Sequence, residues 1–327
     1  MKKENKKIWV YAEAADGKLT KVFTELLCKS RSLGAAEVDA VVLGSGLNNV
    51  LKEIKTAGPD KVYYVDDPAL AKYDIEVYKH ALIELIKSYS PDAVLFGATV
   101  TGSELAPSTA AALKIGLAAH CVDITAREDG ETSYWVPAFG GNVIGEIMIP
   151  DHSPEMASVK PGILAVEEYF VNSEPEMIAT TADGLSNIKS GIILKETEAK
   201  VQSGKSLAGA DIVISAGRGI SSEDTWNKLN EIAVKLGAAV GYTRSLLDRG
   251  FVSDESSMIG TSGKSVTPKV YLGFGVSGAT HHVCGMNKSK TIINVNKDSN
   301  AKIFGISDYK VTAKAEDIIA ALYEQLC

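Results

Sequence analysis

The feature of this chain that most constrains its fold is an alternation of short β-rich runs with amphipathic helical patterns, which is interrupted once and then begins again. In the first half, apolar residues at helical spacing predict a helix over residues 22–33, which ends before Gly34, and another over 77–86. This alternation predicts a parallel sheet that is covered by helices on both faces. The strands predicted in this half span 8–11, 38–43, 61–65 and 92–96.

The pattern changes over residues 121–170, where short β-rich segments follow one another without helices between them. We interpret these segments as an antiparallel extension that completes a first domain. A later polar stretch, 196–205, contains few large apolar residues and is the predicted linker. The strands predicted in the extension span 134–137, 142–149 and 157–159.

Strand–helix alternation restarts after this linker. Ser221 or Ser222 is expected to cap a helix over 223–236, and Gly237 is expected to end it. We therefore predict an α/β protein of two domains, which suits a length of 327 residues. Residues 1–200 form a Rossmann-like domain with the antiparallel extension, and residues 207–327 form a small doubly wound domain. Its other predicted elements are strands at 211–215, 239–241, 270–274 and 291–295, and helices at 278–284 and 316–326.

The charge balance and the cysteine spacing exclude several classes of partner and site. A net charge of −7 and a pI near 5.4 argue against binding to nucleic acid or to anionic membranes. The four cysteines lie far apart without a C-x-x-C pair, a spacing that supplies neither a disulfide framework nor a metal-binding pattern. The apolar run at 8–12 is too short for a signal peptide, and no stretch approaches the ~20 apolar residues of a membrane span. We expect a cytoplasmic protein without a metal site.

The loops that follow the strands of the second domain are rich in glycine and in basic residues. Glycine lets backbone amides approach a ligand closely. Because two arginines, a lysine and paired histidines share these loops, we predict an anionic ligand, most simply a dinucleotide. The run that ends at Lys264 is not a P-loop, since Met258 occupies the place of that motif's first glycine. The loops span 216–219, 240–244, 260–264, 273–282 and 294–298.

An ordered set of five motifs in these loops resembles the α subunit of electron-transfer flavoproteins. The motifs read A-G-R-G, V-G-x-T-R-x-x-x-D-x-G, G-x-S-G-K, G-x-S-G-A-x-x-H and N-K-D, within residues 211–309. The first domain resembles the same family through residues 96–98, 104–107 and 137–142. The resemblance therefore extends over nearly the whole chain.

The resemblance implies a heterodimer of α and β subunits that carries electrons between a flavoenzyme, such as an acyl-CoA dehydrogenase, and an acceptor. In this family the second domain of the α subunit binds FAD. That domain swivels against a base made from the first domain and the β subunit. No catalytic nucleophile or acid–base pair is implied, because the chemistry belongs to the flavin.

The resemblance also implies roles for individual basic and hydroxyl residues. Arg218 matches an arginine near the FAD diphosphate and ribose. Arg244, which follows Thr243, matches an arginine held over the flavin ring, where a cation favours the reduced flavin. A surface salt bridge from Arg244 to Asp248 is the alternative that the sequence leaves open. Ser262 matches a hydroxyl residue that contacts flavin N5.

Further matches lie in the last two loops. His282 matches a histidine that hydrogen-bonds the pyrimidine carbonyl of the flavin, and a buried His281–His282 pair without a ligand role is the alternative. The start of the helix expected at 278–284 is predicted to hold the diphosphate through its free amides. The other histidines and the first-domain loop 102–104 are assigned to structure alone. The predicted cofactor-binding residues are Arg218, Thr243, Arg244, Gly260, Thr261, Ser262, Ser277, Gly278, Ala279, Thr280, His281, His282 and Asn296.

Three alternatives to a simple electron carrier remain open at this point. Within the family, the chain fits the α subunit of an electron-bifurcating complex, in which a second FAD in the β subunit takes electrons from NADH and delivers them to ferredoxin and an enoyl-CoA-type acceptor. An NAD-dependent dehydrogenase is a different class, and the absence of an early G-x-G-x-x-G loop counts against it. A nucleotide-binding regulator without a redox role is the third.

Overall fold

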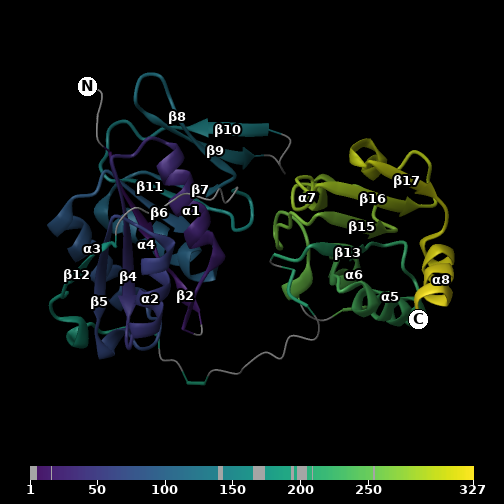
Figure 1. Cartoon of the computed structure of the whole chain (residues 1–327), viewed down its shortest axis with the longest axis horizontal. Coiled ribbons are helices and arrows are strands. Elements are labelled where there is room, and N and C mark those ends of the chain that lie inside the picture. The colour runs from purple at the N-terminus through teal and green to yellow at the C-terminus, as the bar shows by residue number, and fades with distance from the viewer. Residues whose placement is uncertain are drawn as a thin grey trace. The chain divides into compact units, whose positions relative to one another are not determined.

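The chain consists of two compact units, each with its own sheet and core (Figure 1). The first unit comprises Met1–Pro137 and Ile144–Thr197, and the second comprises Ala138–Val143 and Glu198–Cys327. The structure is a computed structural model. It describes residues 6–15, 17–138, 143–164, 174–192, 195–196, 205–207, 209–252 and 255–327.

A seven-stranded parallel sheet forms the centre of the first unit, in the order β12-β5-β4-β1-β6-β11-β7. The predictions of a parallel sheet and of its first four strands are confirmed. Every residue of the innermost strand after Lys7 is buried, as expected for a strand covered on both faces. The strands are β1 (Lys7–Tyr11), β4 (Glu37–Gly44), β5 (Lys61–Asp66), β6 (Ala93–Gly97), β7 (Leu117–Cys121), β11 (Glu155–Val159) and β12 (Glu176–Ala179).

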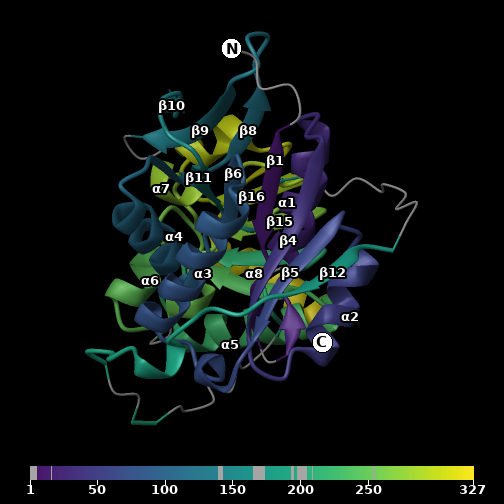
Figure 2. The ribbon, with the colours of Figure 1, turned by 90° about the vertical axis from the view of Figure 1, so that its left-hand side faces the viewer.

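Helices cover both faces of this sheet (Figure 2). Because side chains alternate along a strand, Val10 joins the core under α1 and α2, whereas Trp9 joins the core under α3 and α4. The helices predicted at 22–33 and 77–86 are confirmed, and Gly34 has the positive φ of 75° expected after a helix. The helices are α1 (Lys21–Ser32), α2 (Asn48–Ala57), α3 (Ile75–Tyr89) and α4 (Val100–Leu113).

The antiparallel extension is present, but it contains only part of the segment predicted for it. A three-stranded sheet is formed by β8 (Asp123–Ala126), β9 (Thr132–Ala138) and β10 (Val143–Ile147), and β8 pairs with β9 in antiparallel register. The prediction that 157–159 belongs to this extension is wrong, because β11 lies between β6 and β7 in the parallel sheet. Its five residues are all buried, but they include small and polar residues, so the sequence did not indicate an interior strand of the parallel sheet. Most of the predicted linker, 197–204, lies outside the described residues.

The second unit is a five-stranded parallel sheet in the order β14-β13-β15-β16-β17. The helix predicted over 223–236 is confirmed. The Ser222 hydroxyl accepts a hydrogen bond from the backbone N–H of Thr225 at 3.2 Å, and Gly237 ends the helix with a φ of 60°. The elements are β13 (Ile212–Ala216), α5 (Glu223–Leu236), β14 (Ala239–Tyr242), α6 (Arg244–Asp248), β15 (Val270–Phe274), α7 (Thr280–Val283), β16 (Thr291–Asn296), β17 (Tyr309–Thr312) and α8 (Ala315–Leu326).

Two separate cores cover the faces of this second sheet. Leu229 of α5 and Ile319 of α8 pack on one face, and Ile303 of the short 3-10 turn Lys302–Ile306 packs on the other. The helix predicted over 278–284 is shorter than expected, since α7 is only four residues long. No helix in the described part of the chain is long and apolar enough to cross a membrane. The predicted α/β class with two parallel sheets is confirmed.

Candidate functional site

The topology of the second sheet identifies the edge at which a ligand is expected. The chain passes from β13 to β14 on one side and returns to β15 on the other side of β13. In open parallel sheets, ligands bind beyond the carboxyl ends of the strands where the strand order reverses in this way. The loops that follow Ala216, Tyr242 and Phe274 leave this edge, and they hold most of the predicted cofactor-binding residues.

The glycines at this edge bring two loops together backbone to backbone. A Cβ on Gly217 would lie 2.3 Å from the carbonyl oxygen of Gly275, and a Cβ on Gly275 would lie 2.5 Å from the Cα of Gly219. The Gly219 N–H also donates to the Gly275 carbonyl at 3.2 Å. Only glycine allows so close an approach, so these residues join the β13 and β15 loops in addition to any contact with a ligand.

Both predicted arginines are exposed, Arg218 in the loop after β13 and Arg244 at the first residue of α6. Arg218 makes no side-chain hydrogen bond or ion pair with any described residue. The Arg244 side chain is 64 % exposed, and its Nε lies 3.5 Å from the Asp248 carboxylate. The alternative salt bridge therefore exists, but an exposed pair of this kind contributes at most about 1 kcal/mol. Arg249 Nη1 donates to the Arg218 carbonyl at 3.2 Å and so joins the two loops.

Sequence reasoning missed Arg249. It lies inside the motif that begins at Val240, at a position that the motif leaves unspecified. Its spacing gives no signal, because the role depends on α6 ending beside the β13 loop. Thr243, immediately before that helix, donates its backbone N–H to the Ala216 carbonyl at 2.9 Å, and its hydroxyl lies 2.8 Å from the Ser245 hydroxyl.

Loop 260–264 is held against α7. The backbone N–H and the hydroxyl of Thr261 donate to the His281 carbonyl at 2.7 and 3.1 Å. Gly260 has a φ of 146°, and a Cβ there would lie 2.5 Å from the same carbonyl oxygen. The side chains of Thr261 and Ser262 are nevertheless exposed at the edge. The structure thus brings Gly260, Thr261 and His281 together.

His282 is buried and hydrogen-bonded on both ring nitrogens. Its Nε2 lies 2.7 Å from the Tyr271 hydroxyl, and its Nδ1 lies 3.0 Å from the Ile259 carbonyl oxygen. Burial lowers the pKa of the imidazole from 6.5 to about 4, although the contact with Ile259 acts in the opposite direction. The ring is therefore neutral near pH 7. Tyr271 was not predicted as a site residue. Its place inside the strand predicted at 270–274 could have indicated a buried hydroxyl that needs a partner.

The loop before α7 is fixed by a close contact with the 3-10 turn Lys302–Ile306. Gly278 has a φ of 84°, and a Cβ there would lie 2.2 Å from the Ile303 nitrogen. The backbone carbonyl of Ser277 accepts a hydrogen bond from the Ile303 N–H at 3.3 Å. The side chains of Ser277 and Ala279 are exposed. Thr280 begins the short helix and is partly exposed.

Asn296 joins the ends of two strands. Its Nδ2 donates to the Val276 carbonyl at 2.8 Å, and its Oδ1 accepts from the Asp298 N–H at 3.0 Å. The amide therefore holds the β15 and β16 loops together. Its partial exposure still leaves one side of the group accessible from the edge.

The first unit has an analogous edge, beyond β1 and β6. There the Thr99 hydroxyl accepts a hydrogen bond from the Gly102 N–H at 3.0 Å and donates to the Glu13 carboxylate. Burial raises the pKa of Glu13, although hydrogen bonds from Thr99 and Thr101 oppose the shift. The carboxylate of Glu13 thus lies at the start of α4, and residues 102–104, which resemble a nucleotide-binding loop, lie within this helix.

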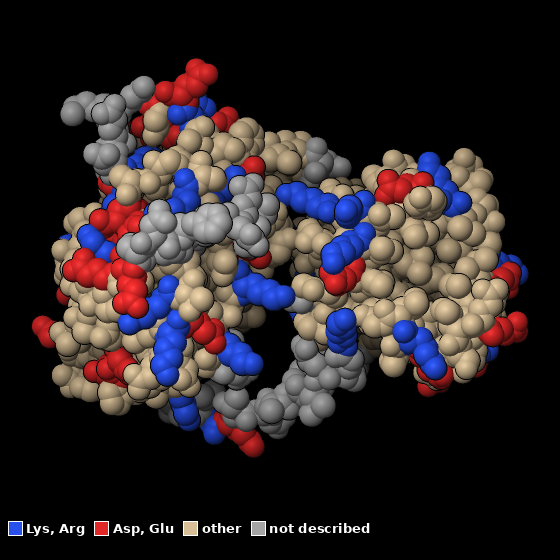
Figure 3. Space-filling model, viewed as in Figure 1, with Lys and Arg blue, Asp and Glu red and all other residues tan. Residues whose placement is uncertain are grey.

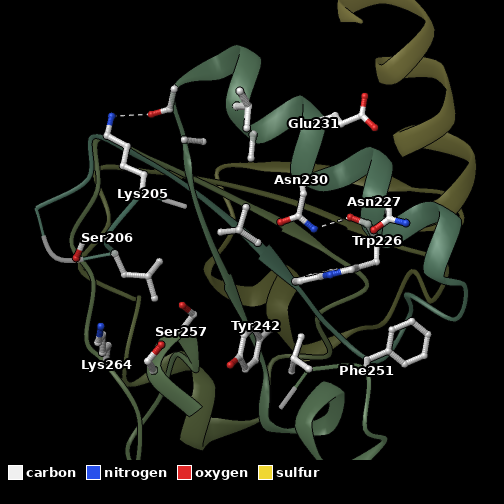
Figure 4. A pocket seen from close by; sticks show the side chains of 18 residues that line it. Lys205, Ser206, Trp226, Asn227, Asn230, Glu231, Tyr242, Phe251, Ser257 and Lys264 are labelled. Carbon is white, nitrogen blue, oxygen red and sulfur yellow. Dashed lines mark hydrogen bonds between the residues drawn. The ribbon is translucent and has the colours of Figure 1, made fainter. Parts of the chain in front are cut away.

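A cavity of about 970 Å³ opens elsewhere in the second unit, between α5 and the outer side of edge strand β14 (Figure 4). Trp226, Phe251 and Tyr242 give it apolar walls, and Asn230 and Lys264 add polar groups. None of the predicted cofactor-binding residues lines it. Most of its lining lies away from the carboxyl edge, but Tyr242, the last residue of β14, and Lys264 of loop 260–264 belong to that edge.

Comparison with known proteins assigns both units. A family model described as "Electron transfer flavoprotein domain" matches residues 8–183, and one described as "Electron transfer flavoprotein FAD-binding domain" matches residues 206–287. The chain belongs to the electron transfer flavoprotein alpha subunit family. It is 38 % identical to the electron transfer flavoprotein subunit alpha of Thermoanaerobacterium thermosaccharolyticum, over 98 % of both chains. It is 34 % identical to that of Megasphaera elsdenii, over 99 % of this chain and 97 % of the relative.

A relative named Protein FixB, from Clostridium saccharobutylicum, is 32 % identical over 98 % of this chain and 96 % of its own. The match to the FAD-binding domain shows that this electron transfer flavoprotein subunit binds FAD, and it covers all the predicted site residues except Asn296. The exposed cations and hydroxyls at the carboxyl edge fit the diphosphate and the polar rim of that cofactor.

Over the drawn face of the first unit, Lys and Arg are interspersed with Asp and Glu (Figure 3). Among the described residues, no group of three or more His, Cys, Asp or Glu side chains could hold a metal ion.

Proposed function

We propose that this chain is the α subunit of a heterodimeric electron-transfer flavoprotein that carries electrons between a flavoenzyme dehydrogenase, of the acyl-CoA dehydrogenase type, and an acceptor in the cytoplasm. The observation that carries the proposal is the pair of exposed arginines, Arg218 and Arg244, at the carboxyl edge of an FAD-binding domain. FAD supplies the electron-transfer chemistry when bound. The chain binds FAD, orients it and stabilises its charge.

In this proposal each arginine has a separate task. Arg218, which has no competing contact with described residues, holds the diphosphate through its planar guanidinium. Arg244 places a positive charge beside the flavin ring and thereby favours the reduced cofactor. Arg249 fixes the two loops relative to each other by its hydrogen bond to the Arg218 carbonyl. The hydroxyls of Thr261 and Ser262 complete the polar rim.

We further propose that a β subunit covers part of the first unit. Family membership supports this partner. A group of exposed apolar side chains on and beside β10 also supports it, because exposed apolar patches are typical of protein–protein interfaces. The domain limits 1–200 and 207–327 remain our proposal, with the second domain swivelling against the base. The apolar group comprises Ile144, Ile147 and Met148.

Co-expression with a β subunit tests these proposals. We expect a yellow one-to-one heterodimer by light scattering, with one FAD in this chain. Arg218→Ala should weaken FAD binding about tenfold or more. Lys228→Ala is the matched control, since Lys228 is a cation of the same unit that pairs with Asp224 on α5. Equal FAD affinity in the two variants would contradict the role of Arg218.

The flavin content and spectrum distinguish the alternatives. A second FAD in the heterodimer, reduced by NADH and coupled to ferredoxin, would support the electron-bifurcating complex instead of the simple carrier. A colourless protein that binds a nicotinamide nucleotide would support an NAD-dependent dehydrogenase. A colourless protein without redox activity that binds another nucleotide would support a regulator.

A further inference from the structure

Arg249 is anchored at the end of α6 and reaches the loop after β13. Leu246 of the same helix is fully buried, and Gly250 follows the helix with a φ of 72°. From this anchor the Arg249 Nη1 donates to the Arg218 carbonyl at 3.2 Å. The contact uses one of the five N–H donors of the guanidinium group, and it holds the two arginine-bearing segments beside each other.

Neither arginine forms an ion pair with a carboxylate in the described part of the chain. Asp248, which precedes Arg249, pairs with Arg244 instead. Glu316 of α8 accepts the hydroxyl and the backbone N–H of Ser221 at 2.6 and 3.1 Å, and these hydrogen bonds lower the pKa of its carboxyl group. The carboxylates on both sides of the arginine pair are therefore ionised and already bound. An anion that contacts both guanidinium groups would relieve the repulsion between them.

Free backbone donors lie in the loops after β13 and β15. The N–H groups of Arg218, Gly278 and Ala279 donate to no acceptor among the residues that the structure describes. The Gly219 N–H donates to the Gly275 carbonyl at 3.2 Å and so joins the two loops that carry these donors. Donors from three segments thus belong to one edge of the sheet, a pattern that suits the several oxygens of a diphosphate.

We propose that Arg249 binds the diphosphate of the cofactor, which it holds together with Arg218 as a pair of guanidinium groups. One N–H of Arg249 fixes the loop after β13, and its remaining donors face no competing acceptor within the described residues. Arg249 therefore acts on the cofactor directly, in addition to fixing the loops. This inference rests on the proposed function, because it requires FAD at this edge.

The salt dependence of FAD binding to the FAD-stripped heterodimer tests the charge of Arg249. Arg249→Gln keeps an N–H donor but has no charge, whereas Arg249→Lys keeps the charge. At low salt, we expect the Kd of FAD to rise about tenfold in Arg249→Gln and about twofold in Arg249→Lys. The increase of Kd with NaCl concentration should be less steep in Arg249→Gln than in the wild type, because one attracting charge is lost.

Lys205→Gln is the matched control. Lys205 is also an exposed cation of the second unit that donates to a backbone carbonyl, that of Gly237 at 2.8 Å. This variant should bind FAD with the affinity and salt dependence of the wild type. Phosphorus nuclear magnetic resonance of bound FAD supplies a second measurement: the diphosphate signals should move in Arg249→Gln and stay in place in Lys205→Gln.

The outcomes separate this proposal from the proposed function. Absence of FAD from the wild-type heterodimer would contradict the proposed function. Equal affinity, salt dependence and phosphorus signals in Arg249→Gln and Lys205→Gln would contradict the phosphate contact of Arg249 alone. A tenfold loss in Arg249→Gln with the salt dependence of the wild type would also overturn this contact, because it would reflect a displaced loop and not a lost charge.

Discussion

Acid should destabilise the second unit through His282, and the size of the effect follows from the burial of its ring. Burial lowers the pKa of the folded-state imidazole from 6.5 to about 4. Between these values the unfolded chain binds a proton that the folded state excludes. The contribution of the neutral ring is thus fully present above pH 6.5 and is lost as the pH falls. The free energy of unfolding should decrease by up to ~1.4 kcal/mol per pH unit, or about 3 kcal/mol in all.

Hydrogen exchange of the β15 amides at several urea concentrations measures this free energy in the second unit alone. The comparison uses FAD-free heterodimer throughout. His282→Gln removes the titrating group, and His281→Gln is the matched control, because His281 is its exposed neighbour. Between pH 6.5 and 4, the free energy of unfolding of the second unit should fall by about 3 kcal/mol more in the wild type and in the control than in His282→Gln. Parallel profiles for the wild type and His282→Gln would refute the reasoning.

Three further perturbations act on other parts of the chain. Arg244→Ala should lower the one-electron flavin potential by about 50 mV, after discounting for its exposure, while FAD still binds; a spectroelectrochemical titration measures both. Gly278→Ala should lower the Tm of the second unit, because a Cβ there lies 2.2 Å from the Ile303 nitrogen at a φ of 84°. Burial and the neighbouring Glu37 raise the pKa of Asp39 to about 8, so the first unit of the wild type should lose stability as the pH rises toward 8. Asp39→Asn should abolish this loss, and hydrogen exchange of the β4 amides at several pH values measures it.

Local patterns were sufficient to predict eight strands of the two parallel sheets, but they did not predict the outer strands β7, β12 and β17 or the helices α2 and α4. The helix α5 begins and ends as predicted, because its start at Ser222 and its end at Gly237 are both marked by specific residues. The strand β15 was also predicted with its bounds, since its apolar run is short and flanked by loop residues. β11 was assigned to the wrong sheet, because the choice between a parallel and an antiparallel neighbour depends on contacts with β6 and β7.

The site was predictable to the extent that its residues lie at strand ends. Arg218, Arg244 and Ser262 are exposed at the carboxyl edge, where the strand–loop pattern placed them. Arg249 and Tyr271 were not predictable in this way. Each acts through a backbone or ring partner that is distant in sequence, and such a partner becomes apparent only when the loops are folded together.

The motif residues fall into two groups that differ in their contacts within the chain. Gly217, Gly275, His282 and Asn296 are already committed to contacts within the chain, and these contacts hold the loops of the carboxyl edge together. Arg218 has no such commitment with described residues, and recognition of an anionic cofactor requires a free donor. The loss of a residue in the first group should therefore reduce stability and FAD binding together. The loss of Arg218 should weaken binding while leaving the fold intact.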